Sequence, residues 1–239
     1  MTTIDDNLKL VQQRLVAACN QYGRTVTDIR LLAVSKTFPA QAVKALYEAG
    51  QTAFGENYVQ EALDKIALLR HLPIEWHCIV PLQSNKTRAV AEHFDWVHSV
   101  DRLKIAQRLS EQRPPDLPEL QVCIQVNIDA AATKSGVPPA QVAQLARQIV
   151  ALPRLRLRGI MTIPEPHPDF AQMCALHAQA KALFDRLRLS GLDIDTLSMG
   201  MSADLEAAVA SGSTLVRVGS ALFGDRAIPA KAPEPLQKP

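Results

Sequence analysis

The stretch Ile29-Arg30-Leu31-Leu32-Ala33-Val34-Ser35-Lys36-Thr37 decides the fold prediction, because an apolar run ends abruptly at a lysine. Short apolar runs are typical of buried strands, and the Pro39 that follows suits the first turn of a helix. Lys36 is therefore predicted where a strand ends and a crossover loop begins. In α/β proteins this edge is where ligands bind. A lysine there can be a solvated charge, a phosphate contact or a nucleophile that forms a Schiff base.

The same pattern of a short apolar run followed by a helical segment repeats along the chain. Strands are predicted at residues 30–35, 52–55, 74–80, 96–99, 121–126, 156–162, 195–198 and 214–218. An extra helix over 4–22 precedes the first strand, and Asp101 is the expected N-cap of a helix over 102–111. Eight strand–helix units in about 200 residues favour a single closed (β/α)8 TIM barrel, an α/β fold, over an open doubly wound sheet.

The predicted barrel forms one domain over residues 1–226, and the Pro-rich tail, 227–239, is expected to lack a fixed structure. Of the 239 residues, 47% are apolar and 21% are charged, which is ordinary globular composition. A formal net charge of +2, without a basic cluster, gives no reason to expect a nucleic-acid partner.

The cysteines and the N-terminus indicate the compartment. Four cysteines lie in separate segments without a C-x-x-C pair, so we expect reduced thiols and neither a metal site nor disulfides. The N-terminus does not resemble a signal peptide, and no apolar run is long enough to span a membrane. A cytoplasmic protein with no membrane contact is expected.

Two turns near the end of the predicted domain have the features of a phosphate site. Ser198-Met199-Gly200-Met201-Ser202 leads into a helix with Ser202 as its expected N-cap, and Arg217-Val218-Gly219-Ser220 ends a strand. Barrels bind phosphate in the loops after strands seven and eight, where helix N-termini offer unpaired N–H groups. Gly200 and Gly219 would let the backbone approach a phosphate closely. The alternative is that Ser202 only caps its helix and Gly219 only makes a turn.

A phosphate site and a strand-end lysine in one barrel mouth suggest pyridoxal phosphate (PLP). Only a neutral amine forms a Schiff base, and an ordinary lysine with a pKa of about 10.4 is mostly charged at neutral pH. The apolar run before Lys36 makes partial desolvation of its amine plausible. A Schiff-base aldolase without a cofactor is a further alternative at this point.

Several motifs resemble those of the YggS/PROSC family, the pyridoxal phosphate homeostasis proteins. They follow in order from about residue 30 to 226: Ala33-Val34-Ser35-Lys36-Thr37, Phe54-Gly55-Glu56-Asn57-Tyr58-Val59-Gln60-Glu61, Pro81-Leu82-Gln83-Ser84-Asn85-Lys86, Arg158-Gly159-Ile160-Met161, Ser198-Met199-Gly200-Met201-Ser202 and Arg217-Val218-Gly219-Ser220.

The resemblance implies a barrel of the alanine racemase N-terminal type, the fold-type III PLP architecture. It implies PLP held as an internal aldimine on Lys36, with Arg217 facing the pyridine nitrogen. The phosphate is then expected at the turns that hold Gly200, Ser202, Gly219 and Ser220, with Ser198 and Met199 beside them. Asn57, His77 and Met161 are expected to line the same mouth. From the sequence alone, Arg217 could instead form an ion pair inside the barrel mouth.

Two positions depart from the family pattern. Val80 stands where the family usually has glycine, so the geometry of that loop is in question. Phe38 stands where bacterial members often have a second lysine, so cofactor transfer to that place is not expected. Lys134 is the candidate secondary amine for PLP, and a solvated surface lysine is the alternative reading.

Two functions follow from the resemblance. The favoured one is a non-catalytic protein that binds PLP, buffers it and delivers it to apo PLP-dependent enzymes, and so affects amino-acid and keto-acid metabolism indirectly. The alternative is a small fold-type III enzyme such as an amino-acid racemase. The full racemase resembles this barrel joined to a β-domain, and a partner subunit supplies its catalytic tyrosine. Only a short tail follows residue 226 here, which favours the carrier and a monomer.

Overall fold

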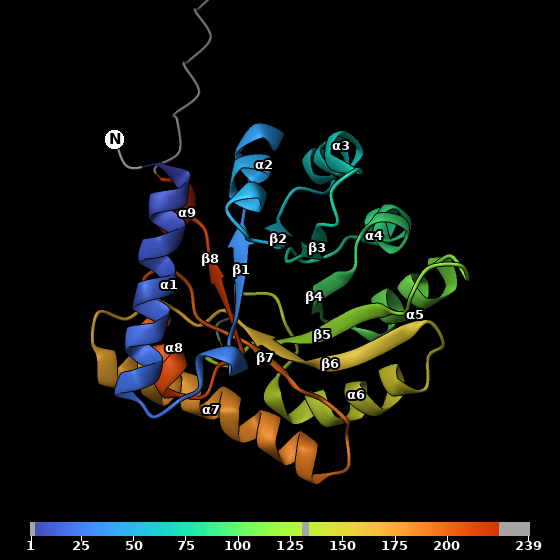
Figure 1. The fold of residues 1–239 in the computed structure, drawn as a ribbon. Coiled ribbons are helices and arrows are strands. Elements are labelled where there is room, and N and C mark those ends of the chain that lie inside the picture. Colours follow the sequence, from blue (N-terminus) through green and yellow to red (C-terminus); the bar gives the residue numbers. More distant parts are fainter. Residues whose placement is uncertain (1–2, 131–133, 225–239) are drawn as a thin grey trace, which may run out of the picture.

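Eight parallel strands form a closed barrel in the computed structural model, which describes residues 3–130 and 134–224 (Figure 1). Each strand pairs with the strands before and after it in the chain, and β8 closes on β1. The strands are β1 (Arg30–Val34), β2 (Ala53–Glu56), β3 (Glu75–Cys78), β4 (Trp96–Val100), β5 (Leu120–Val126), β6 (Leu155–Thr162), β7 (Thr196–Ser198) and β8 (Leu215–Val218). The predicted (β/α)8 barrel is confirmed, whereas the predicted boundary at 226 and the tail lie outside the described residues.

The helices surround the barrel (Figure 1). They are α1 (Ile4–Gln21), α2 (Ala40–Glu48), α3 (Val59–Leu69), α4 (Thr87–His93), α5 (Leu103–Gln112), α6 (Val142–Val150), α7 (Phe170–Leu189), α8 (Leu205–Ala210) and α9 (Ser220–Phe223), with short 3₁₀ turns at Val26–Asp28, Ser84–Lys86 and Pro139–Gln141. Within the described residues, no helix is long and apolar enough to cross a membrane. Asp101 was wrongly predicted as an N-cap: α5 is preceded by Arg102, which makes no side-chain capping bond.

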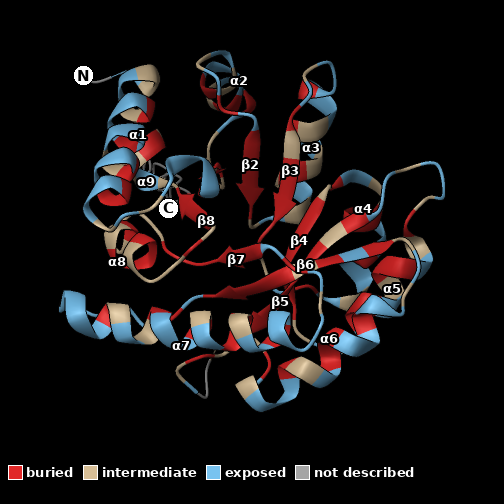
Figure 2. Ribbon diagram, turned by 60° about the horizontal axis from the view of Figure 1, so that its bottom comes forward, coloured by how far each residue is buried: buried red, intermediate tan, exposed pale blue. Residues whose placement is uncertain are grey.

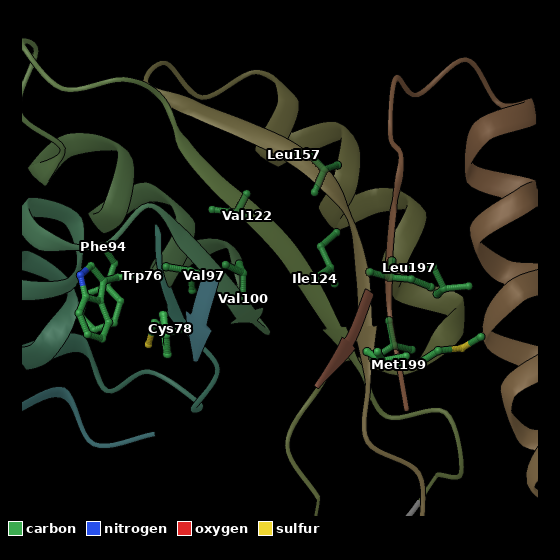
Figure 3. Packing of buried hydrophobic residues seen from close by; sticks show 14 of the residues in the cluster. Trp76, Cys78, Phe94, Val97, Val100, Val122, Ile124, Leu157, Leu197 and Met199 are labelled. Atoms are coloured by element: carbon green, nitrogen blue, oxygen red, sulfur yellow. The ribbon is translucent and has the colours of Figure 1, made fainter. Parts of the chain in front are cut away.

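The main core lies between the barrel and its helices (Figure 2). Helix α6 shows the reason: Val142, Leu145, Ala146 and Ile149 recur at helical spacing and are buried. The facing strand residues are also apolar, because a parallel sheet covered by helices has little contact with water. Figure 3 shows this layer, with Val97, Val122, Ile124, Leu157 and Leu197 among the packed side chains.

The extra helix α1 closes the ring of helices beside the short helices α8 and α9. A capping box between Thr3 and Asp6 fixes its start. Its buried face carries Leu8, Val11 and Leu15. These side chains belong to the main core.

The inside of the barrel carries several buried polar groups. His77 on β3, His98 on β4, Ser198 on β7 and Arg217 on β8 are at most 3% exposed. His98 on β4 lies within hydrogen-bonding distance of Ser198 on β7. Because β4 and β7 are not neighbours in the sheet, these two side chains meet across the barrel axis.

Strand β6 contains an irregularity that only glycine fits. The pairing with β5 skips Arg158, so that Leu157 and Gly159 oppose consecutive residues of β5. Gly159 has a φ of +154°, and a Cβ atom there would lie 1.8 Å from the carbonyl oxygen of Thr196. The backbones of β6 and β7 therefore approach each other too closely for any side chain.

Gly159→Ala is expected to destabilise the barrel by about 4 kcal/mol or more, because either the β6–β7 pairing or the backbone angle must change. Urea unfolding followed by circular dichroism would measure the free energy of unfolding. Gly191→Ala is the matched control, since Gly191 also has a positive φ but open space around it. It should cost only about 1–2 kcal/mol. Equal losses for the two variants would contradict the close approach of the strands.

Candidate functional site

A cavity of about 630 Å³ opens at the carboxyl ends of the strands. It is lined by Val34, Lys36, Phe38, Asn57, Ile79, Ile163, Met201, Ser202, Ala203, Arg217, Gly219, Ser220 and Gly224. The lining comes from the ends of β1, β2, β3, β6, β7 and β8. The cavity thus brings the strand-end lysine and the two predicted phosphate turns together, as expected for a TIM barrel.

A cluster of buried charges fixes the end of β1 just before Lys36. The hydroxyl of Ser35 donates to Glu56 Oε1 at 2.6 Å, and the ammonium of Lys65 donates to the same oxygen at 2.7 Å. Lys65 also donates to the carbonyl of Ser35 at 2.8 Å. Burial raises the pKa of Glu56, although Lys65 and Ser35 oppose the shift. Ser35 is thus held through both its hydroxyl and its carbonyl oxygen. The half-buried Lys36 follows directly after this fixed residue.

The residue after Lys36 is held as firmly. Thr37 has a φ of +69°, which is rare for a β-branched residue, and its N–H donates to Glu61 Oε1 at 2.7 Å. Glu61 in turn pairs with Lys65 at 2.6 Å, one helical turn away on α3. The residues on both sides of Lys36 are thus held by contacts to α3.

Arg217 forms the floor of the cavity and is only 3% exposed. Its Nη1 donates to Ser198 Oγ at 2.7 Å, and its Nη2 donates to the carbonyl of Thr162 at 2.9 Å. Burial lowers the pKa of Arg217 to about 10, although the carboxylate of Asp204 opposes the shift. The guanidinium therefore remains charged at neutral pH.

The end of the cavity where a phosphate was expected is built differently from the prediction. Ser202 lines the cavity but was wrongly predicted as an N-cap, because Asp204 precedes α8. Asp204 Oδ1 accepts from the N–H of Met201 at 2.7 Å, and its Oδ2 lies 2.9 Å from His177 Nε2. Asp204 thereby holds the turn in shape and leaves the Ser202 hydroxyl at the cavity wall.

The two glycines of these turns have different roles. Gly200 has a φ of +92°, and a Cβ atom there would lie 2.3 Å from Ala208 Cβ, so glycine is needed for packing against α8. Gly219 lies at the cavity wall and precedes α9, whose first turn leaves N–H groups without helical partners. Ser220 adds a hydroxyl at the same place.

The rest of the cavity wall is largely apolar. Phe38 stands at the position where a second lysine was expected from the family pattern. It stacks on Phe223 with ring centroids 4.8 Å apart and adds an aromatic ring to the cavity wall. Val80 has no positive φ, and its carbonyl accepts a hydrogen bond from Ser99. The valine is therefore accommodated without the backbone angle that only glycine adopts freely.

Several predicted residues lie away from the cavity wall. His77 and Met161 are fully buried below it inside the barrel, where Met161 packs with Trp96 and Cys123. Ser198 lies beneath Arg217, and Met199 belongs to the core shared with the helices (Figure 3). These residues support the mouth from behind and do not line it.

The predicted secondary amine, Lys134, is held in ion pairs. Its Nζ lies 2.8 Å from Asp129 and 3.0 Å from Glu165. Burial alone would lower the pKa of Lys134, but the two carboxylates outweigh it and raise the pKa. This arrangement argues against a nucleophilic amine, and Lys134 does not line the cavity.

Sequence reasoning missed the apolar wall and the cluster behind Lys36. Glu61 and Lys65 stand at i and i+4 on a predicted helix, a spacing that indicates an ion pair. His98 was missed although alternation along 96–99 places it on the same face as Trp96. The helical spacing and the strand alternation were both visible in the sequence. Neither could show that Lys65 meets Glu56 on β2 or that His98 meets Ser198 on β7.

The described residues fit a bound PLP. The cavity offers a primary amine at Lys36, a cation at its floor and two hydroxyl groups at its rim. Asn57 contributes a buried amide oxygen that has no partner in the structure. Buried polar atoms are normally satisfied, so this atom indicates a ligand or a water molecule. No three potential ligands among His, Cys, Asp and Glu of the described residues lie close enough to hold a metal ion.

Comparison with known proteins identifies the fold and the family of the chain. The sequence profile of the family described as "Alanine racemase, N-terminal domain" matches residues 5–227. An alanine racemase of Clostridium difficile has a TM-score of 0.72 at 14% identity, over 92% of this chain and 57% of that one, which shows the shared fold.

Relatives of higher sequence identity show which family within this fold the chain belongs to. The pyridoxal phosphate homeostasis protein of Pseudomonas aeruginosa is 56% identical over 226 residues, or 95% of this chain and 97% of that one. The protein of the same name from Escherichia coli K12 is 51% identical over 229 residues, or 95% and 98%. The structure of PipY from Synechococcus elongatus with PLP bound has a TM-score of 0.81 and 38% identity, over 93% of this chain and all of that one. The chain belongs to the family of pyridoxal phosphate homeostasis proteins.

Lys65→Met is expected to lower the free energy of unfolding by about 3–5 kcal/mol, because it leaves the charge of Glu56 buried without its partner. The double variant Lys65→Met/Glu56→Gln should recover part of this loss, since the remaining group is neutral. Urea unfolding would measure both values.

Lys44→Met is the control for removing a lysine charge from an ion pair. Lys44 pairs with Glu48 on the exposed face of α2, and its loss should change the stability by no more than about 0.5 kcal/mol. If Lys65→Met were as mild as this control, the buried cluster would not hold the end of β1.

Proposed function

We propose that this protein binds pyridoxal 5'-phosphate on Lys36 and serves in PLP homeostasis, holding and delivering the cofactor without turning over a substrate. One observation carries the proposal: a single cavity combines the amine of Lys36, the buried cation of Arg217 and the hydroxyls of Ser202 and Ser220. PLP, when bound, supplies an aldehyde that condenses with a primary amine and a ring that withdraws electrons. The relatives named for PLP homeostasis and the PLP-bound PipY support the assignment.

Each group has a distinct part in the proposed binding. Lys36 forms the Schiff base, and the apolar side chains of Val34 and Ile79 beside it favour the neutral amine that this reaction needs. The hydroxyls of Ser202 and Ser220 and the backbone at Gly219 bind the phosphate. The side chain of Asn57 lines the cavity between these groups.

Arg217 supports the non-catalytic part of the proposal. A cation at the pyridine nitrogen disfavours protonation of the ring. An unprotonated ring is a weaker electron sink, so chemistry that needs a carbanion receives less help. The burial of Arg217 and its bonds to Ser198 and Thr162 keep the charge in this place.

A small racemase is the second candidate, because alanine racemases share the fold. Racemisation needs acid–base groups on both faces of the reacting carbon. Among the described residues that line the cavity, there is no tyrosine, histidine or carboxylate to act beside Lys36. Tyr58 follows Asn57 but is 55% exposed and is not part of the lining. This composition favours the carrier.

The proposed function also implies partners and a compartment. A protein that delivers PLP is expected to pass it to apo PLP-dependent enzymes. The four cysteines are free thiols, three of them buried, which suits a reducing cytoplasm. A monomer remains our prediction, to be tested by light scattering.

The purified protein is expected to be yellow after loading with PLP, and borohydride should abolish the visible band. Peptide mapping of the reduced protein should place the adduct on Lys36. Lys36→Ala should lose the band and the adduct, whereas Lys134→Ala should keep both, because Lys134 lies in ion pairs outside the cavity. A protein that takes up no PLP would overturn the proposal.

The same preparation of PLP-loaded protein distinguishes a carrier from a racemase. Incubation of the loaded protein with L-alanine should give no D-alanine above the level found with free PLP. Transfer of PLP to an apo enzyme should be measurable as recovered activity of that enzyme. Turnover of alanine that disappears in Lys36→Ala would show that the protein is a racemase.

A further inference from the structure

A chain of hydrogen-bonded side chains, buried except for the half-buried Glu75, connects Arg217 to the far end of the barrel. Ser198 Oγ, which accepts from Arg217 Nη1 at 2.7 Å, lies 3.0 Å from His98 Nδ1. His98 Nε2 is 2.8 Å from His77 Nδ1, and His77 Nε2 is 2.5 Å from Glu75 Oε1. The five residues come from β8, β7, β4 and β3, so the chain crosses the inside of the barrel.

The carboxylate end of the chain fixes the direction of its hydrogen bonds, because an ionised carboxylate can only accept. His77 therefore donates from Nε2 to Glu75, and a neutral His77 accepts at Nδ1 from His98 Nε2. A neutral His98 in turn accepts at Nδ1 from the hydroxyl of Ser198, whose oxygen also accepts from Arg217. Both imidazoles are neutral and carry their proton on Nε2.

The opposite order would require a doubly protonated His77. The charged groups near His77 are Glu75 and Arg30, and Arg30 Nη1 itself pairs with Glu75 at 2.8 Å. Burial lowers the pKa of His77, although Glu75 opposes the shift. Burial, together with His77 and Arg217, holds the pKa of His98 well below its usual range. The two buried rings are therefore neutral at pH 7.

Glu75 is the anionic end of the chain. Burial alone would raise its pKa, but His77 and Arg30 outweigh burial and lower the pKa of Glu75 to about 2. The carboxylate thus stays ionised across the working pH range. It lies at the opposite mouth of the barrel, where it lines a second cavity with Arg30 and Arg158.

The chain leaves Arg217 with donors to spare. One N–H of Nη1 is used by Ser198, and one N–H of Nη2 is used by the carbonyl of Thr162. A guanidinium has five N–H groups in one plane. Two anchors on different nitrogens fix that plane, so the remaining donors keep a constant direction relative to the cavity that Arg217 lines.

We propose that Ser198, His98, His77 and Glu75 are positioning residues that hold Arg217 in one orientation toward the ring of the ligand in the cavity. The identity of that ligand rests on the proposed function, whereas the direction of the hydrogen bonds does not. A layer that served stability alone would tolerate exchange of these groups without any effect on the ligand, since buried polar networks are often replaceable by apolar ones.

The first arm of the test uses protein without PLP. Nitrogen NMR of histidine labelled with ¹⁵N distinguishes the two neutral tautomers from the charged ring. Signals that disappear in His98→Gln and in His77→Gln identify the two rings among the six histidines. Both should be neutral with the proton on Nε2 at pH 7. A charged His77, or a proton on His98 Nδ1, would overturn the directed chain.

The second arm compares variants of the PLP-loaded protein. His98→Leu removes both hydrogen bonds of the ring and should speed PLP loss about tenfold, the effect of roughly one lost bond to a charged group. It should also shift the visible band, because the direction of the cation changes. His98→Gln keeps an acceptor and a donor and should recover most of the wild-type behaviour.

Cys123→Ala is the matched control for packing. Cys123 is fully buried inside the barrel beside Trp96, which stacks on His77, but takes no part in the chain. It should lower the melting temperature without changing the rate of PLP loss by more than about twofold. If His98→Leu does not fold, Ser198→Ala is the smaller change and should also speed PLP loss.

The outcomes separate the two proposals. If the wild type takes up no PLP, the proposed function fails while the NMR arm still decides the direction of the chain. If the wild type binds PLP and both His98→Leu and Ser198→Ala keep its band and its rate of loss, the positioning role fails alone. A loss of stability without a change in PLP retention would show that the chain is structural only.

Discussion

The burial of a permanent charge inside the barrel is the constraint on which the rest of the site depends. Moving a guanidinium out of water is costly unless hydrogen bonds and opposite charges replace its hydration. Arg217 obtains these from Ser198, from the carbonyl of Thr162 and from the nearby Asp204. The requirement explains why polar side chains occupy positions that apolar residues fill in most barrels of this kind.

A second set of buried charges solves a different problem at the end of β1. The Lys65 amine touches Glu56, Glu61 and the carbonyl of Ser35, so it joins α3 to two strand ends. The side chain of Glu56 is fully buried and that of Lys65 is 5% exposed, so solvent screens their attraction little. Because Thr37 is held by the same cluster, the backbone on both sides of Lys36 is fixed by charged groups that do not line the cavity.

The sequence was sufficient for the architecture because each element has a local signal. Apolar runs such as Leu31 to Val34 mark strands, and the spacing of Val142, Leu145 and Ile149 marks a helix. The cavity residues Lys36, Ser202 and Ser220 were found because strand ends in a barrel meet at one face. The wrong N-cap at Ser202 has a local cause: Asp204, two residues later, is also of a residue type preferred at N-caps, and the helix begins after it although its side chain makes no capping bond.

The interior could not be predicted in the same way, because its partners are set by the barrel as a whole. His98 and Ser198 stand 100 positions apart in the chain and meet only because β4 and β7 face each other across the axis. Sequence periodicity tells which face a side chain takes but not what lies opposite. His77 was therefore expected at the mouth, whereas the structure places it one level lower, between Glu75 and His98.

This buried polar layer also restricts how the strands can pair. A slip of one residue in β4 would turn His98 toward the helices and bring Val97 inward, which would leave His77 and Ser198 without partners. A purely apolar interior would tolerate such a slip more easily, because one apolar side chain can replace another. The irregular pairings of β4 and β6 with β5 show that the register is adjusted locally. We infer that the buried polar groups, costly as they are to bury, favour one register of the strands, and that register places Arg217 and Lys36 in the same cavity.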